Sequence, residues 1–268
     1  MAPRSGRVIT AALGAALCLW IWSLAGVLFV IRWTSLERPA LVQPRPFVRG
    51  EMRVGVDASY PPFAVATSDD LWGLDIDLAR ALGDHLRTPV RFVNLGFDGL
   101  YDALLTEQVD VLISALVVNP AQMDRVAYTR SYFDAGLVLV APAESDVDTM
   151  NNLPGRTLTL ELGSEAQGEA NRWLRRVLPF DIAPYETPAA ALDAVRLGSS
   201  DAALVDQISA RLYVREHPDW RVRQSVVTHT LFAIAVRADQ PRVFAAVNRA
   251  LDLLEADGTL RTIIERYL

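Results

Sequence analysis

The stretch GLDIDLARAL at residues 73–82 constrains the fold of this chain more than any other feature. It follows an extended segment at residues 52–56 and a YPPF turn, and it opens an amphipathic repeat. Leu78, Leu82 and Leu86 fall on one face at helical spacing, which predicts a helix that packs along one side. Asp75 is the predicted N-cap of this helix, because an acid suits the positive end of a helix dipole.

Strands and helices alternate along the rest of the first half. Residues 90–94 read as a strand, Gly99 precedes a helix, and residues 109–113 form an apolar run typical of a buried parallel strand. Strand–helix–strand–helix–strand is a doubly wound α/β pattern. A second α/β run follows, with predicted strands at 157–160, 201–205 and 229–236 and helices from Ser164 and Thr187; two final helices cover 243–255 and 260–267.

Composition excludes several function classes. The chain is 51% hydrophobic, which is enough for a large core. Its net charge of −6 argues against nucleic acid as the partner. The single cysteine, Cys18, allows neither an intrachain disulfide nor a multi-cysteine metal site, and the three histidines have no ligand-like spacing. We therefore expect no metal and no cofactor.

An uncharged apolar run occupies residues 8–31, which is long enough to cross a bilayer of roughly 30 Å as a helix. No Ala-x-Ala cleavage site follows it, and Leu17 before Cys18 makes a poor lipobox. The run therefore predicts an uncleaved transmembrane anchor. More arginines follow the span than precede it, so charge alone does not favour an external C-terminal domain. The Pro/Arg-rich residues 32–50 read as a stiff tether.

The segments MRVGVDASYPPF at 52–63 and GLDIDL at 73–78 resemble the opening of the family 3 extracellular solute-binding proteins, the polar amino acid receptors of ABC importers. The resemblance covers about residues 52–268 and implies a type II periplasmic-binding-protein fold of two lobes. We expect the first lobe at 51–135 and 236–268 and the second at 136–235. The resemblance also places the domain on the periplasmic side of the inner membrane, held by the single-pass anchor.

Candidate ligand-binding residues follow the carboxyl ends of the predicted strands, where ligands bind in open α/β sheets. From the first lobe they are Asp57, Tyr60, Phe97 and Ser114, and from the second Gly163, Ser164 and Asp206. Tyr60 and Phe97 would enclose the apolar or cationic part of a solute. Asp206 would accept an ammonium group, and backbone N–H groups at Gly163 and Ser164 would receive an anionic group. Asp57 matches the acid that meets the basic side chain in the basic amino acid receptors.

The chain departs from the family at one position. The family shows Thr-x-x-Arg after the third strand, where the arginine grips the ligand's α-carboxylate. Here the sequence reads NPAQ at 119–122, so Gln122 stands in place of that arginine, with Arg125 three residues on. Glu165 adds a negative charge beside Asp57 and Asp206. An acidic cleft of this kind favours a cationic ligand.

Three functions fit these observations. The first is a membrane-anchored solute-binding protein that captures a small polar, cationic or amino-acid-like ligand for an ABC importer. The second is an enzyme similar to the cyclohexadienyl dehydratases, which share the fold and act on dicarboxylates; the acidic cleft argues against it. The third is a sensory or scaffold protein with a degenerate cleft. No catalytic residues are predicted, and the first function is preferred.

Overall fold

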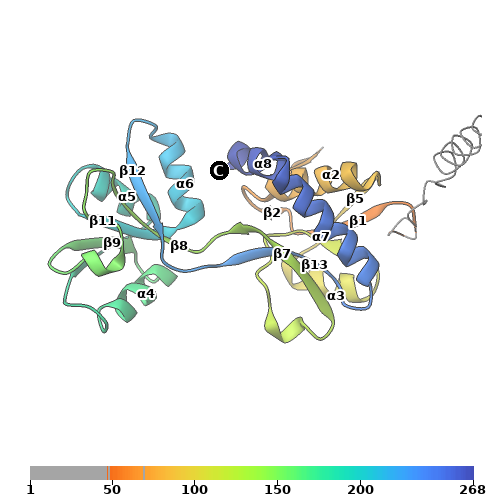
Figure 1. Ribbon diagram of the computed structural model, residues 1–268, viewed down its shortest axis with the longest axis horizontal. Coiled ribbons are helices and arrows are strands. Elements are labelled where there is room, and N and C mark those ends of the chain that lie inside the picture. Colours follow the sequence, from red (N-terminus) through yellow and green to blue (C-terminus); the bar gives the residue numbers. More distant parts are fainter. Residues whose placement is uncertain (1–46, 48, 69) are drawn as a thin grey trace, which may run out of the picture. The chain divides into compact units, whose positions relative to one another are not determined.

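The computed structural model describes residues 47, 49–68 and 70–268. Pro46–Leu268 form one compact unit. Within it the chain builds two five-stranded sheets, each at the centre of its own α/β lobe (Figure 1). The predicted anchor at 8–31 and most of the tether at 32–50 lie outside the described residues. In the part that is described, no helix is both long and apolar enough to cross a membrane.

The first sheet has the strand order β5-β1-β6-β13-β7. Its parallel strands are β5 (Val90–Asn94), β1 (Met52–Val56) and β6 (Val111–Leu112). Two antiparallel strands extend it, β13 (Leu231–Arg237) and β7 (Val126–Asp134). All five residues of β1 are buried, because helices cover both faces of the sheet.

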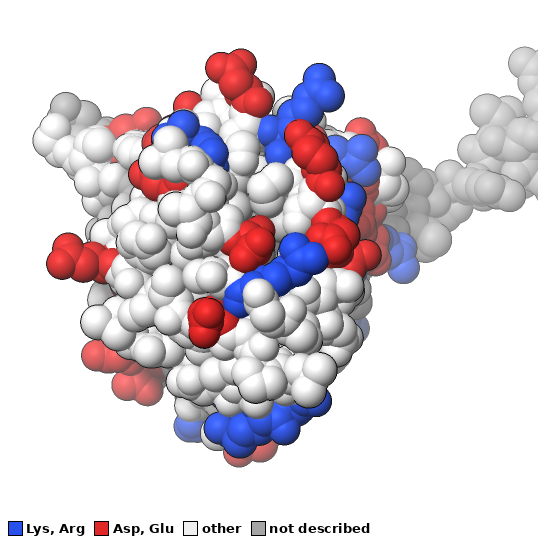
Figure 2. Space-filling view, turned by 90° about the vertical axis from the view of Figure 1, so that its left-hand side faces the viewer, with Lys and Arg blue, Asp and Glu red and all other residues white. Residues whose placement is uncertain are grey.

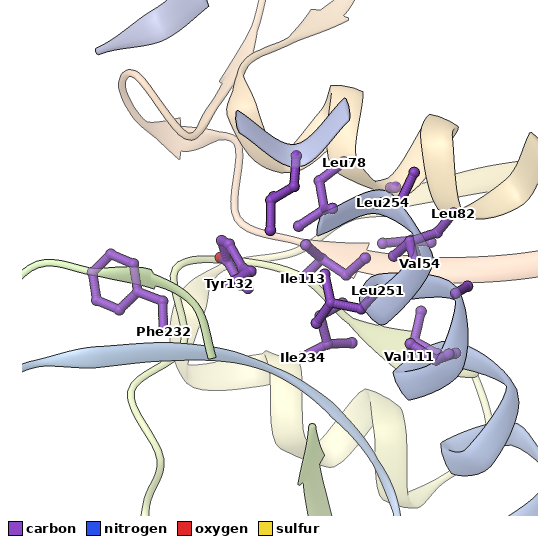
Figure 3. Close-up of a cluster of buried hydrophobic side chains, with 14 of the residues drawn as sticks. Val54, Leu78, Leu82, Val111, Ile113, Tyr132, Phe232, Ile234, Leu251 and Leu254 are labelled. Carbon is purple, nitrogen blue, oxygen red and sulfur yellow. The ribbon is translucent and has the colours of Figure 1, made fainter. Parts of the chain in front are cut away.

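Alternate residues of the β6 segment divide the first core into two sides. Val111 and Ile113 pack with α2 (Leu74–Leu86), α7 (Pro241–Ala256) and α8 (Thr259–Tyr267), as Figure 3 shows. Leu112 points the other way and packs with α3 (Leu100–Leu105). This two-residue period is that of a strand buried on both faces. The doubly wound prediction for this lobe is confirmed.

The second sheet repeats the arrangement with the order β10-β9-β11-β8-β12. Its strands are β10 (Asp181–Tyr185), β9 (Thr157–Glu161), β11 (Ala202–Asp206), β8 (Leu137–Pro142) and β12 (Val222–Val226). One face packs against α4 (Glu165–Trp173), and the other against α5 (Pro188–Arg196) and α6 (Gln207–Glu216). Each lobe therefore has its own double core.

Short elements complete the described fold. A small sheet of β2 (Ser59–Tyr60), β3 (Ala64–Ala66) and β4 (Leu71–Trp72) follows β1. Three single-turn 3-10 helices, η1 (Phe97–Gly99), η2 (Pro120–Gln122) and η3 (Met150–Asn152), lie in the loops. The first two follow strands of the first lobe, and η1 carries one of the candidate ligand-binding residues.

Two crossings connect the lobes, from β7 to β8 and from β12 to β13 (Figure 1). The first lies at 135–136, close to the predicted Gly136. The second lies at 227–230, earlier than the predicted Val236, because β13 pairs with β6 and β7 in the first sheet. The apolar sequence of β13 suits a buried strand in either lobe, so the hydrophobic pattern alone does not show to which lobe β13 belongs.

The start of α2 differs from the prediction that Asp75 caps it. The N-cap is Gly73, at φ 135°, and Asp75 lies in the first turn and is 1% exposed. A Cβ at Gly73 would lie 2.2 Å from the Phe63 carbonyl oxygen, so only glycine fits this close approach. Asp75 is thereby free to turn its carboxylate inward, toward the loop after β6.

Candidate functional site

A cavity of about 530 Å³ opens where strands of both sheets end. Its polar lining comes from Asp57, Ser59, Ser114, Glu165, Asp206 and Thr230, and its apolar lining from Tyr60, Phe97, Ala115, Val117, Ala135, Ile208 and Phe232. A second cavity of about 210 Å³ lies in the second lobe and shares Glu165 and Asp206 with the first. The structure therefore brings together five of the predicted residues: Asp57, Tyr60, Phe97, Ser114 and Asp206.

Asp57 lies just past the end of β1 and is held by its neighbours. Its N–H donates to Ser114 Oγ at 2.9 Å, which joins the ends of two parallel strands. Its Oδ1 accepts from the Ser59 N–H at 3.1 Å and from the Ser59 hydroxyl at 2.7 Å. These bonds fix the direction of the carboxylate at the cavity wall.

Exposed aromatic rings form the apolar part of the wall. Tyr60 is 46% exposed and Phe97 52% exposed, although both are large and apolar. Tyr60 stacks on the buried Phe63 with ring centroids 5.5 Å apart, and Phe63 meets Phe232 edge to face. Burial raises the pKa of the Tyr60 hydroxyl, and the carboxylate of Asp206 adds to that rise. The ring of Tyr60 is therefore held in place by its stacking on Phe63, and it lies close enough to Asp206 of the second lobe to feel the charge of that carboxylate.

A buried network holds the loop after β6. Asp75 Oδ2 accepts from the Ala115 N–H at 2.8 Å, and Asp75 Oδ1 accepts from the Tyr132 hydroxyl at 2.7 Å. Ala115 lines the cavity and has φ 45°, an unusual conformation for a residue other than glycine. Burial raises the pKa of Asp75 to about 7 despite these two bonds. Burial and the neighbouring Asp75 also raise the pKa of Tyr132.

Internal hydrogen bonds occupy several of the donors at the start of α4. The Gly163 N–H donates to Gln167 Oε1 at 2.7 Å, and the Gln167 N–H reaches Ser164 Oγ at 3.4 Å. The Ser164 hydroxyl itself donates to the Glu161 carbonyl at 2.7 Å. Ser164 lines the smaller cavity, whereas Gly163 lines neither of the two. The Gly163 N–H group, which was expected to receive an anion, is therefore bonded within this segment, and Glu165 places a carboxylate in the first turn of α4.

Asp206 has two roles at once. Its Oδ1 accepts from the Ser209 N–H at 2.9 Å, so it is the N-cap of α6. It also lines both cavities. The sequence analysis predicted a ligand contact for Asp206, and the structure shows that it also caps α6.

Gln122 lines neither cavity. Its Oε1 accepts from Arg125 Nη2 at 2.9 Å, and Arg125 is exposed. Gln122 and the arginine three residues on are therefore bonded to each other outside the cavity lining.

Several lining residues were missed by the sequence analysis. Ser59 and Val117 are close neighbours of predicted residues, and an Asp-x-Ser pattern was the available signal for Ser59. Ala135 and Thr230 lie on the crossings between the lobes. Phe232 lies on β13, which the sequence analysis assigned to the second lobe and the structure places in the first sheet. No periodicity marks a crossing residue, because its position depends on how the two lobes meet.

Within the described residues, His, Cys, Asp and Glu side chains form no group of three or more placed to hold a metal ion. The cavity chemistry consists of carboxylates, hydroxyls and aromatic rings.

The fold and the cavity define a two-lobed α/β architecture of the periplasmic-binding-protein type. A family model for bacterial extracellular solute-binding proteins, family 3, matches residues 52–268. The chain belongs to this family, and the resemblance seen in its opening motifs is confirmed.

Individual proteins agree with the family match. ABC transporter arginine-binding protein 1 of Escherichia coli (strain K12) is 27% identical over 224 residues, covering 81% of this chain and 90% of that protein. An ancestral cationic amino acid solute-binding protein superposes with a TM-score of 0.59 at 28% identity, covering 82% and 96%. The unliganded, open L-cystine solute receptor of Neisseria gonorrhoeae has a TM-score of 0.72 at 23% identity, covering 83% and 94%, and supports the fold.

Proposed function

We propose that this protein captures a small cationic solute, an amine or a cationic amino acid, between its two lobes and delivers it to an ABC importer. Residues 8–31 hold it in the inner membrane, with the lobes on the periplasmic side. No bond of the ligand is made or broken.

One observation carries this proposal. The cavity of about 530 Å³ combines exposed aromatic rings with carboxylates that come from both sheets. Rings and carboxylates are the two partners that a cation prefers, and a cation over a ring contributes about 0.5–2 kcal/mol. Relatives named for arginine and for cationic amino acids support the same ligand charge.

Titration calorimetry on the purified full-length chain tests the proposal. Arginine, lysine and aliphatic amines are the cationic probes, and glutamate is the anionic control. We expect saturable binding of at least one cation and none of glutamate. If all cations fail to bind, the proposed function is wrong.

A dehydratase similar to the cyclohexadienyl dehydratases is the second candidate. Its dicarboxylate substrate would need cationic side chains in the cavity, whereas the described lining has only carboxylates as charged groups. Prephenate turnover by the purified chain would favour this candidate. A sensory or scaffold role is the third, and co-purification with a permease under mild detergent separates transport from sensing.

Membrane attachment is tested separately. We expect the native protein to stay in the membrane pellet after carbonate extraction, with its folded part open to protease in spheroplasts. Mass spectrometry of the native protein provides the control. A mature N-terminus after Ile31, or a diacylglyceryl group on Cys18, would contradict the anchor.

A further inference from the structure

The two cavities share lining residues, and all their charged lining residues have the same sign of charge. They share Glu165 and Asp206, and Asp57 and Glu161 add a carboxylate to the larger and the smaller cavity respectively. Among the described residues that line them there is no arginine, lysine or histidine. By contrast, Figure 2 shows acidic and basic side chains interspersed over the end of the molecule that faces its viewer. Charges of both signs therefore occur on that face, whereas the charged residues that line the cavities are all acidic.

Three of the groups at the start of α4 that could bind a ligand carboxylate are already occupied. The Gly163 and Gln167 N–H groups and the Ser164 hydroxyl are bonded within the start of α4. Arg211, on the helix that Asp206 caps, lies over the ring of Phe133 and lines neither cavity. A carboxylate placed inside would therefore meet like charges at short range, which is unfavourable in a partly dehydrated site.

The lining residues of the two cavities suit a ligand with two charged ends. The larger cavity has the exposed rings of Tyr60 and Phe97, and the smaller one has the carboxylates of Glu161 and Glu165 without aromatic rings. An apolar spacer would lie along the rings, with one cationic group near Asp57 and Asp206 and another in the smaller cavity.

We propose that the ligand is an elongated dication without a carboxylate, an aliphatic diamine or amino-guanidine, whose two cationic ends occupy the two cavities. This inference rests on the proposed function and narrows its ligand from cations in general to carboxylate-free dications. Four carboxylates offer more charge than a single ammonium neutralises, so the second cationic end adds affinity.

Matched probes test each part of the proposal by calorimetry on the full-length chain. 1,5-Diaminopentane differs from L-lysine only by the carboxylate, and from n-pentylamine only by the second amine. We expect the diamine to bind at least tenfold more tightly than either.

The outcomes separate this inference from the proposed function. Lysine binding as tightly as the diamine would overturn the exclusion of carboxylates and leave the proposed function standing. Pentylamine binding as tightly would overturn the two-ended ligand. No binding of any of these probes or of arginine would overturn the proposed function itself.

A substitution in the smaller cavity locates the second cationic end. Glu161→Gln keeps size and removes one charge from a residue that lines only that cavity. We expect it to weaken diamine binding at least fivefold and to leave pentylamine binding unchanged, which also reports that the larger cavity is intact. Glu144→Gln, an exposed position of the same lobe outside both linings, is the charge-matched control and should change neither. An equal loss of affinity for the diamine and for pentylamine would contradict the placement of the second cationic end in the smaller cavity.

Discussion

The two lobes present walls of different chemistry to the cavity. The first lobe contributes rings and hydroxyls with one acid, and the second contributes three acids together with aliphatic side chains. The first wall rests on buried groups, because Phe63 lies under Tyr60 and Asp75 holds Ala115. The aromatic rings of the cavity therefore come from the first lobe, and most of its carboxylates come from the second. Changes behind the first wall should therefore cost stability, and substitutions that only remove charge from the second wall should alter affinity alone.

The largest expected effect concerns the network behind the first wall. Burial raises the pKa of Asp75 from its ordinary value of 3.8 to about 7 in the folded protein. The folded state therefore holds this proton to higher pH than the unfolded state. Stability from this group is present at low pH and is lost as the pH rises from about 4 to about 7, by on the order of a few kcal/mol.

Urea denaturation of the wild type and Asp75→Asn at pH 5 and pH 8 measures this contribution. The asparagine does not titrate, so the variant should lose less free energy of unfolding over this interval than the wild type. Parallel losses in the two proteins would show that Asp75 stays ionised at both values of pH.

The next largest effect is expected at Gly136, on the first crossing between the two lobes. A Cβ added there would lie 2.0 Å from the Thr228 carbonyl oxygen on the other crossing, so one crossing must move. Gly136→Ala should cost about 1–3 kcal/mol of stability, measured by urea denaturation. Gly168→Ala within α4 is the control, since its Cβ would meet only Arg172 Nη1 at 3.9 Å, and it should stabilise by about 0.5–1 kcal/mol.

Asp206→Asn tests the charge of the second wall without disturbing its fold. Asparagine caps helices as well as aspartate does, so the variant should have the same melting temperature as the wild type. Cation affinity should fall at least about tenfold, or about 1.4 kcal/mol, measured by calorimetry. Asp206→Ala should show the same loss of affinity together with about 1 kcal/mol of lost stability. An unchanged cation affinity in both variants would show that Asp206 does not contact the ligand.

The smallest effect is expected from a ring of the first wall. Tyr60→Leu removes the aromatic face while keeping apolar bulk, and cation binding should weaken about three- to fivefold. Tyr60→Phe keeps the ring and should bind as the wild type does. Calorimetry with the same cation distinguishes these variants. Equal weakening in both would assign the contribution to the hydroxyl and not to the ring.

Local signals account for what the sequence predicted correctly. The starts of α4 and α5 follow Ser164 and Thr187, whose side chains accept from backbone N–H groups three residues on. Such caps depend on neighbours in the chain and can be read from a few residues. The alternation of strands and helices likewise revealed the fold class.

Long-range packing accounts for what the sequence did not predict. Gly73 caps α2 because the Phe63 backbone passes close by, and that approach is invisible in the local pattern. The predicted position of the second crossing was wrong because a buried strand has the same apolar pattern in either lobe. Gln122 was assigned to the site by its place in a motif, whereas the structure places it outside both cavity linings, bonded to Arg125.

The second lobe is an insertion into a β-hairpin. β7 and β13 are antiparallel neighbours, and where they leave the first sheet Asp134 pairs with Leu231 and the Ala135 N–H donates to the Thr230 carbonyl at 2.8 Å. Entry to and exit from the inserted lobe are therefore adjacent, which is the geometry in which one domain is exchanged for another. Replacing residues 137–227 by the corresponding lobe of a relative would change the acidic wall and keep the aromatic one. A graft must bring equivalents of Ile208 and Leu212, which pack on the first core. Ligand charge and ligand shape could then be recombined as separate modules of one chain.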